Sequence, residues 1–257
     1  MQLDPRASAA GVRLVAHEVL VSTNAEALAL AGRGEQGPLW ITAGHQTGGR
    51  GRRGRTWVSE RGNLFASLLL TDTAPPEHWP ELAFVAALAI HDAVAETAPA
   101  LRPQLSIKWP NDLLLDGQKF SGILIEGEGG VEGGGAVVIG IGVNCVSHPA
   151  DTDDPATDLK AAGAAVMAEA LFAALSAKML GRLAQWNDGE HFSTIRADWL
   201  ARAAGRGGQI RVRLAEDREL VGRFDDVDDA GRLVLSLPDG GRQSIAAGDV
   251  VALLGPR

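Results

Sequence analysis

The chain has 257 residues, 46% of them hydrophobic, which is enough for a large buried core, or for a main domain with a smaller one beside it. Its formal net charge of -8 argues against a general nucleic-acid-binding protein, because such domains carry a basic excess. No stretch approaches the roughly 20 apolar residues of a membrane helix, and Asp4 and Pro5 stand where a signal peptide would be apolar, so we expect a cytoplasmic protein.

The first half of the chain predicts a mixed β-sheet packed with helices. Thr23 and Glu26 fit a capping box at the start of the first long helix, and Asp116-Gly117 between two apolar runs indicates a tight hairpin. A glycine-rich stretch at 127–135 is expected to be a solvated loop. Strands are predicted at 12–20, 38–44, 63–70 and 105–110, on either side of the hairpin turn and at 136–144, and helices at 22–32 and 79–97.

The pattern changes near Gly207. Before it, 164–186 and 190–205 have helical spacing; after it, short apolar runs alternate with Asp/Gly turns, which is typical of a small β-barrel. We therefore expect two domains, 1–206 and 207–257. The barrel strands are predicted at 209–214, 219–224, 232–237, 242–247 and 250–253.

Residues 48–57, GGRGRRGRTW, contain four glycines and four arginines. Glycine lets the backbone approach a ligand closely, and arginine donors match the oxygens of carboxylates and phosphates. The segment therefore predicts an anion-binding loop, with a solvated flexible loop as the alternative. Its spacing is neither that of a Walker A loop nor that of a dinucleotide-binding turn. Without a ligand we expect disorder, because glycine loses much conformational entropy on ordering and the arginines repel one another.

Three further motifs place polar side chains at predicted strand ends or turns, where ligand-binding groups gather. They are KWPND at 108–112, KFSGILIE at 119–126 and GIGVN at 140–144. Each residue alone is also explained as an ordinary solvated side chain. The candidates are Lys108, Asn111, Asp112, Lys119 and Asn144.

Taken in order with STN at 22–24 and GHQTGGRGRRGRTW at 44–57, these motifs resemble those of the biotin protein ligases. The resemblance covers residues 12 to 145, and the helices and small barrel that follow match that family's architecture. It implies an α+β fold: a class II synthetase-like biotin/lipoate ligase catalytic domain with a mixed sheet, plus a C-terminal SH3-like β-barrel. It also implies that biotin and ATP give biotinyl-5′-AMP, after which biotin passes to a lysine of a carrier domain.

The resemblance implies roles for individual residues. Ser22, Thr23, Asn24 and Gln46 would hydrogen-bond the ureido ring, with backbone contacts from Gly51. Arg50, Arg52 and Lys119 would stabilise the charge that builds on the α-phosphate, together with Mg²⁺. Trp57 would pack near the adenylate, Lys108 would bind the nucleotide, and Asn111 and Asn144 would help position the nucleotide or a metal ion. Asp112 is the candidate base for the acceptor lysine. Trp109 fits a ligand wall or the core equally well.

The expected partner is the biotin carboxyl carrier domain of a carboxylase. Because only 21 residues precede Ser22, we expect no DNA-binding domain, and the enzyme would be a monomer or a homodimer. The single cysteine, Cys145, predicts a buried thiol rather than a disulfide or a zinc site, and no metal-ligating residues are assigned. The alternatives are a lipoate or octanoate ligase or transferase, a biotin-sensing regulator without catalysis, and a nucleic-acid binder that uses the arginine loop.

Overall fold

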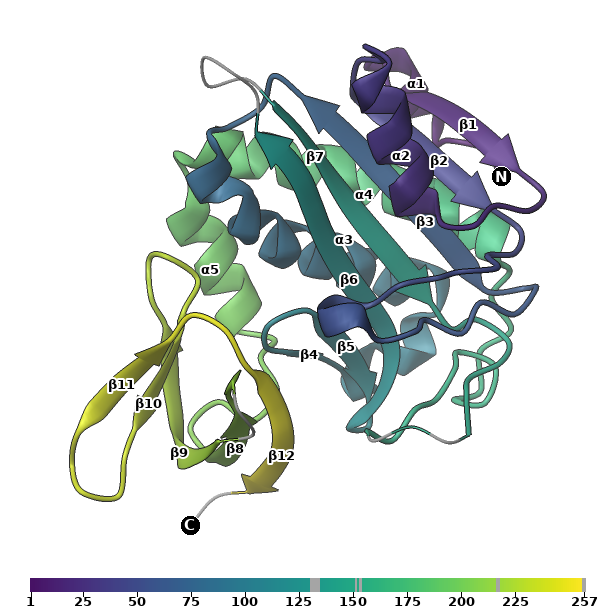
Figure 1. Ribbon diagram of the computed structural model, residues 1–257. Coiled ribbons are helices and arrows are strands. Elements are labelled where there is room, and N and C mark those ends of the chain that lie inside the picture. The colour runs from purple at the N-terminus through teal and green to yellow at the C-terminus, as the bar shows by residue number, and fades with distance from the viewer. Residues whose placement is uncertain (130–134, 151, 153, 216–217, 256–257) are drawn as a thin grey trace.

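The computed structural model describes residues 1–129, 135–150, 152, 154–215 and 218–255 (Figure 1). They form a seven-stranded sheet, a five-stranded sheet and the helices that cover them. The α-helices are α1 (Pro5–Ala9), α2 (Thr23–Gly32), α3 (Leu82–Thr97), α4 (Ala168–Trp186) and α5 (Phe192–Leu200), and the 3-10 helices are η1 (Arg52–Gly54), η2 (Pro76–Glu81), η3 (Pro99–Gln104) and η5 (Asn187–Gly189). The strands are β1 (Arg13–His17), β2 (Leu39–Ala43), β3 (Leu64–Thr71), β4 (Leu105–Lys108), β5 (Asp112–Leu115), β6 (Gln118–Gly129), β7 (Gly135–Val143), β8 (Gln209–Arg213), β9 (Glu219–Val227), β10 (Leu233–Ser236), β11 (Arg242–Ile245) and β12 (Asp249–Gly255).

The seven-stranded sheet has the order β1-β2-β3-β7-β6-β5-β4. Only the β1–β2 pair is parallel; the other neighbours are antiparallel, which confirms the predicted mixed sheet. Helix α2 covers one face, and α3 and α4 cover the other (Figure 1). The sheet therefore has a thick helical layer on one side and room for a ligand beside the single helix on the other.

Strand β3 shows how the sequence divides the two faces. Leu64, Ala66 and Leu68 join the large core shared with α3 and α4, while Leu69 joins a smaller cluster with Ala27 of α2. This is the alternation that a strand buried on both faces requires. Ser67 is the polar exception on the α2 side, and it is completely buried.

The tight turn between β5 and β6 is confirmed, but the predicted capping box is wrong. Asp116 and Gly117 both have positive φ, 46° and 80°, as a two-residue hairpin turn requires. Helix α2 is capped by Ser22, whose hydroxyl accepts from the amide of Ala25. Thr23 is the first residue of the helix, one position after the cap. Of the predicted glycine-rich loop, residues 130–134 lie outside the described part of the chain.

The C-terminal strands form an antiparallel sheet of order β11-β10-β9-β8-β12, so the five predicted short strands are present. The sheet packs against the first part of the chain near β4 and α5 (Figure 1). The indole N–H of Trp109 donates to the carbonyl of Gly231, 3.1 Å away, so Trp109 belongs to the core that joins the two sheets. In the described residues, no helix is both long and apolar enough to cross a membrane.

Candidate functional site

A cavity of about 440 Å³ lies beside the N-terminus of α2 and the strands β6 and β7. The residues given a binding or catalytic role in the sequence analysis all line it, although they come from five separate segments of the chain. They are Ser22, Thr23, Asn24, Gln46, Arg50, Gly51, Arg52, Trp57, Lys108, Asn111, Asp112, Lys119 and Asn144. The fold thus brings the motifs together, and the role of each residue remains a prediction.

One end of the cavity carries uncharged hydrogen-bonding groups at the start of α2. The side-chain oxygen of Gln46 accepts from the amide of Thr23 at 2.9 Å and from its hydroxyl at 3.1 Å. The amide nitrogen of Gln46 donates to Ser59 at 3.0 Å. Gln46 is therefore held on both sides, and its orientation relative to α2 is fixed before any ligand arrives.

Asn24 joins this end to the arginine loop through Glu126 of β6. Its amide nitrogen donates to Glu126 Oε2 at 2.8 Å, and Arg50 donates to the same oxygen at 3.2 Å. The hydroxyl of Ser67 lies 2.6 Å from Asn24 Oδ1 and 2.7 Å from Thr23 Oγ1. These charge-assisted and buried contacts keep Asn24 in one orientation.

The floor of the cavity is made of strand glycines covered by Trp57. A Cβ at Gly142 would lie 2.5 Å from the indole of Trp57, and one at Gly122 would lie 3.0 Å from it. Lys119 Nζ lies 5.6 Å from the centre of the same ring, within the range of a cation–π contact. The indole N–H of Trp57 is buried without a hydrogen-bond partner in the described structure. Because glycine has no side chain, β6 and β7 leave space at Gly122 and Gly142, and the ring of Trp57 fills it.

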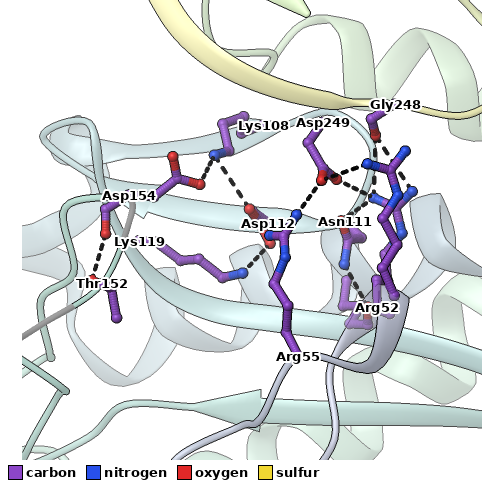
Figure 2. A network of polar contacts seen from close by, with 12 residues as sticks. Arg52, Arg55, Lys108, Asn111, Asp112, Lys119, Thr152, Asp154, Gly248 and Asp249 are labelled. Atoms are coloured by element: carbon purple, nitrogen blue, oxygen red, sulfur yellow. Dashed lines mark hydrogen bonds and ion pairs between the residues drawn. The ribbon is translucent and has the colours of Figure 1, made fainter. Parts of the chain in front are cut away.

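The other end of the cavity carries two lysines and two carboxylates (Figure 2). Lys119 Nζ lies 2.6 Å from Asp112 Oδ1, and Lys108 Nζ lies 3.4 Å from Asp112 Oδ2 and 2.9 Å from Asp154. The Lys119 contact is a charge contact, because Asp112 Oδ1 has no hydrogen bond of good geometry. Burial disfavours the charge of Lys108, but the two carboxylates outweigh it and raise the pKa of Lys108. Lys108 therefore remains cationic at neutral pH.

The arginine loop is tied to the C-terminal sheet. Arg52 donates to Asp249 and to Asn111, each at 3.1 Å; Arg53 donates to Asp249 at 3.2 Å, and Arg55 also pairs with it (Figure 2). The expectation of a disordered loop is thus not met, because Asp249 offsets the repulsion among the arginines. The amide of Gly51 donates to Arg55 within the loop at 2.7 Å, so it is not free for a ligand in this state.

Burial lowers the pKa of Arg52, and the carboxylate of Asp249 opposes this shift. The guanidinium remains charged, since arginine titrates far above neutral pH. A partly buried cation beside a cavity is a strong site for an anion, because the surrounding protein screens it less than water would. Arg52 is therefore the least exposed of the three loop arginines that line the cavity, the others being Arg50 and Arg55.

Two residues near the end of β7 are structural in this state. Asn144 donates to the carbonyl of Thr157 at 3.1 Å, and its own amide donates to Phe120 at 2.8 Å, so it fixes the chain that closes this end of the cavity. Cys145 is fully buried, as predicted, and burial raises the pKa of its thiol to about 12. This thiol is therefore not a nucleophile at neutral pH.

Sequence reasoning missed four polar residues of the site. Glu126 stood at the end of the quoted motif KFSGILIE, where a carboxylate closing an apolar strand was the available signal. Ser67 interrupts an apolar strand, which is a weaker signal. Asp154 and Asp249 lie in turns and at a strand start, and nothing in their local sequence distinguishes them from solvated acidic residues.

The described residues contain no cluster of three or more His, Cys, Asp or Glu side chains that could hold a metal ion. The nearest carboxylates to the cationic end, Asp112 and Asp154, are paired with lysines. A magnesium ion usually keeps several waters and binds through one or two carboxylates together with substrate phosphates. The donor set therefore fits magnesium only as an ion that is carried in by a nucleotide.

Comparison with known proteins identifies relatives of both sheets. Residues 18–144 match the biotin/lipoate A/B protein ligase family, and residues 207–252 match the biotin protein ligase C-terminal domain. The chain is 43% identical to a biotin–[acetyl-CoA-carboxylase] ligase of Paracoccus denitrificans over 89% of this chain and 96% of that protein. It is 36% identical to a ligase of the same name from Mycobacterium tuberculosis, over 90% of this chain and 86% of that protein.

Among solved structures, the fold is similar to that of a biotin protein ligase from Aquifex aeolicus in complex with biotin and ATP. The TM-score is 0.75 and the identity 23%, over 92% of this chain and 97% of that one. At this identity the comparison shows that the fold is shared.

Proposed function

Because the chain belongs to the biotin protein ligase family, we propose that it is an ATP-dependent ligase that converts biotin to biotinyl-5′-AMP and transfers the biotinyl group to a lysine of a carrier protein. The single observation that carries this proposal is the convergence of the predicted residues on one cavity. That cavity has an uncharged polar end, an apolar floor and a cationic end. Biotin has the same sequence of parts: a ureido ring, a hydrocarbon chain and a carboxylate.

The polar end is suited to the ureido ring. A ureido group offers one carbonyl acceptor and two N–H donors, and Thr23, Asn24 and Gln46 supply hydroxyl and amide partners in fixed orientations. Such prearranged groups favour a ligand whose donors and acceptors match all of them. Lipoate and octanoate lack a ureido ring, so this end of the cavity favours biotin.

In the first step a carboxylate oxygen of biotin attacks the α-phosphorus of ATP. A phosphorus–oxygen bond forms, the bond to the β-phosphate breaks, and pyrophosphate leaves with the electron pair. Negative charge builds where two anions meet, and Arg52 and Lys119 lie at the cavity end where this happens. Magnesium bound to the nucleotide would supply further neutralisation of the phosphate charge. Arg50, held by Glu126, would close the side nearer the polar end.

In the second step the nitrogen of the acceptor lysine attacks the acyl carbon of the adenylate, AMP leaves, and the lysine loses a proton. The sequence made Asp112 the candidate base. Its two oxygens instead face the ammonium groups of Lys119 and Lys108, at 2.6 and 3.4 Å. This arrangement supports a role in which Asp112 fixes the position of Lys119, and it would have to release that lysine before it accepted a proton.

The proposal includes a carboxylase carrier domain as the acceptor and a cytoplasmic location, where ATP is available. Specific DNA binding is not part of it, because a net charge of -8 gives no electrostatic attraction to phosphate backbones. A footprint on the promoter of the organism's own biotin genes would contradict this point. Sedimentation of the purified chain with and without biotin and ATP would distinguish a monomer from a homodimer.

The decisive experiment follows pyrophosphate release from ATP and Mg²⁺ with biotin, lipoate or octanoate as the acid. We expect release with biotin and much less with the other two. Equal rates with biotin and lipoate would reject the biotin assignment, and no release with any acid would reject a ligase and favour a binding protein. Adding a biotin carboxyl carrier domain should then give a product heavier by one biotinyl group, on a single lysine.

A further inference from the structure

The carboxylate of Asp249 is shared by three arginines of the loop. Asp249 begins β12 in the C-terminal sheet and lies 197 positions from Arg52 in the sequence. Arg52 and Arg53 lie 3.1 and 3.2 Å from it, and Arg55 also contacts it. The neighbouring carbonyl of Gly248 accepts from both terminal nitrogens of Arg52, each at 3.4 Å. One end of β12 thus holds the loop by side chain and backbone together.

The three arginines are not equivalent. The side chain of Arg52 is 26% exposed and also reaches Asn111 within the cavity, whereas the side chains of Arg53 and Arg55 are 37% and 51% exposed. Arg53 therefore serves as an attachment to Asp249, whereas Arg55 both contacts Asp249 and lines the cavity. Arg52 is the residue whose position relative to the cavity depends on that attachment.

The contacts between Asp249 and the arginines stabilise the ordered loop electrostatically. Closely spaced guanidinium groups on a glycine-rich segment repel one another, and ordering that segment costs conformational entropy. A carboxylate that is only 15% exposed offsets the repulsion in a region of weak screening. The loop can then have a defined path without a ligand, and a ligand that binds it has less entropy to remove.

We propose that Asp249 is a positioning residue that ties the arginine loop to the C-terminal sheet and so keeps Arg52 at the cavity. The consequence for nucleotide rests on the function proposed above. When ATP binds, a phosphate oxygen accepts from Arg52, and Asp249 remains on Arg53 and Arg55. The loop stays in place over the adenylate until the carrier lysine attacks. The C-terminal sheet thereby contributes to the first step without touching the reacting atoms.

The first test needs no substrate. Trypsin cleaves after arginine, and the loop holds four of them, so its cleavage rate reports how often the loop opens. Asp249→Asn keeps the shape of the side chain and removes its charge. We expect cleavage between residues 50 and 56 to become about three to ten times faster than in wild type, the scale expected for loss of a few partly exposed ion pairs.

The matched control is Asp225→Asn. Asp225 lies in β9 of the same sheet, its side chain is 17% exposed, and it pairs with Arg223 at 2.8 Å. It resembles Asp249 in burial and in having an arginine partner, but it makes no contact with the loop. This variant should be cut at the wild-type rate. Thermal unfolding of both variants then separates a local effect on the loop from a general loss of stability.

The second test measures catalysis in the full chain. In Asp249→Asn we expect the KM for ATP to rise about tenfold while kcat changes by about twofold or less, because the loop must be ordered on binding. Biotinyl-AMP should also escape faster and label an unrelated lysine-rich protein. Asp249→Glu should restore both properties, and Asp225→Asn should leave them at wild-type values. Arg53→Gln should raise the KM for ATP from the loop side, because Arg53 contacts Asp249 and does not line the cavity, and this variant decides the matter if Asp249→Asn does not fold.

Three results with Asp249→Asn would each overturn the proposal. They are an unchanged rate of trypsin cleavage, an unchanged KM for ATP and a lowered KM for ATP. A lower KM would show that Asp249 competes with the nucleotide for Arg52 rather than positioning it. If wild type releases no pyrophosphate with biotin, the proposed function fails instead. The trypsin experiment would still decide whether Asp249 ties the loop.

Discussion

Asn24 occupies the space that a side chain at Gly140 would need, because a Cβ at position 140 would lie 2.2 Å from Asn24 Oδ1. Gly140 lies in β7 and Asn24 in the first turn of α2. The start of the helix therefore packs directly against the backbone of β7 at Gly140. The close approach brings the amide of Asn24 to Glu126 and its oxygen to Ser67. The first glycine of the GIGVN motif therefore shapes the polar end of the cavity.

Gly140→Ala should move Asn24 out of place. We expect biotin binding, measured by calorimetry, to weaken about tenfold or more, the scale of one misplaced hydrogen-bonding group. The matched control is Gly129→Ala in β6, where a Cβ meets no atom within 4 Å and affinity should not change. Adding Asn24→Ala to Gly140→Ala should recover stability by removing the clash while affinity stays low. Normal biotin affinity in the single variant would refute this account of Gly140.

Ser67→Ala should weaken biotin binding without unfolding the protein. The hydroxyl of Ser67 is fully buried and contacts both Thr23 and Asn24, so its removal frees two groups assigned to the ureido ring. We expect a loss of about 1–2 kcal/mol in biotin binding, or roughly tenfold in Kd. Thr42→Val is the control, because its hydroxyl is buried without a hydrogen-bond partner in the described structure. Equal affinities of the two variants would show that Ser67 does not orient the site.

Lys119→Ala should remove adenylate formation while the fold persists. Lys119 contacts Asp112 and lies over Trp57 at the edge of the cavity, so its charge acts on the ligand more than on the core. Loss of one well-placed charge contact should cost about 3 kcal/mol, or about a hundredfold in the rate of pyrophosphate release. Lys160→Ala, at an exposed position, is the control. Unchanged turnover in the Lys119 variant would exclude this lysine from the first step.

Asp92→Asn should destabilise the helical layer in a pH-dependent way. Burial alone would raise the pKa of Asp92, but contacts with His91 and Arg182 outweigh it and lower the pKa to about 2. A carboxyl whose folded pKa lies below its unfolded value stabilises the fold above the unfolded value, near pH 4. That stabilisation, about 1 kcal/mol after allowance for screening by solvent, is lost as the pH falls from 4 toward 2.

The measurement is urea unfolding of wild type and Asp92→Asn at pH 7 and at decreasing pH. The difference in free energy of unfolding between wild type and Asp92→Asn should be present at pH 7 and should become smaller below pH 4. Asp229→Asn, at an exposed turn position, should differ little from wild type throughout. A gap that stays constant down to the acid limit would mean that the charge of Asp92 is not its source.

The sequence by itself predicted the strands of both sheets, the long helices and thirteen residues that line the cavity. Alternating apolar residues, the Asp116-Gly117 turn and the change of pattern near Gly207 are local signals, and each acts over a few residues. The motifs were recognisable together, because five separated segments resemble those of the biotin protein ligases in order and spacing. Even there a local rule failed at Thr23, whose hydroxyl binds Gln46 and Ser67 while Ser22 caps the helix.

Only the tertiary structure decided which charges meet. Arg52 contacts Asp249, which is 197 positions away in the sequence. Ser67 contacts Thr23 at a separation of 44 positions, and Lys108 contacts Asp154 at a separation of 46. Nothing in the residues around these side chains identifies their partners, because the partners are set by the order of strands and the docking of the C-terminal sheet. Side-chain pairing acts through space over a few ångströms, and the chain path that creates that closeness is a property of the whole fold.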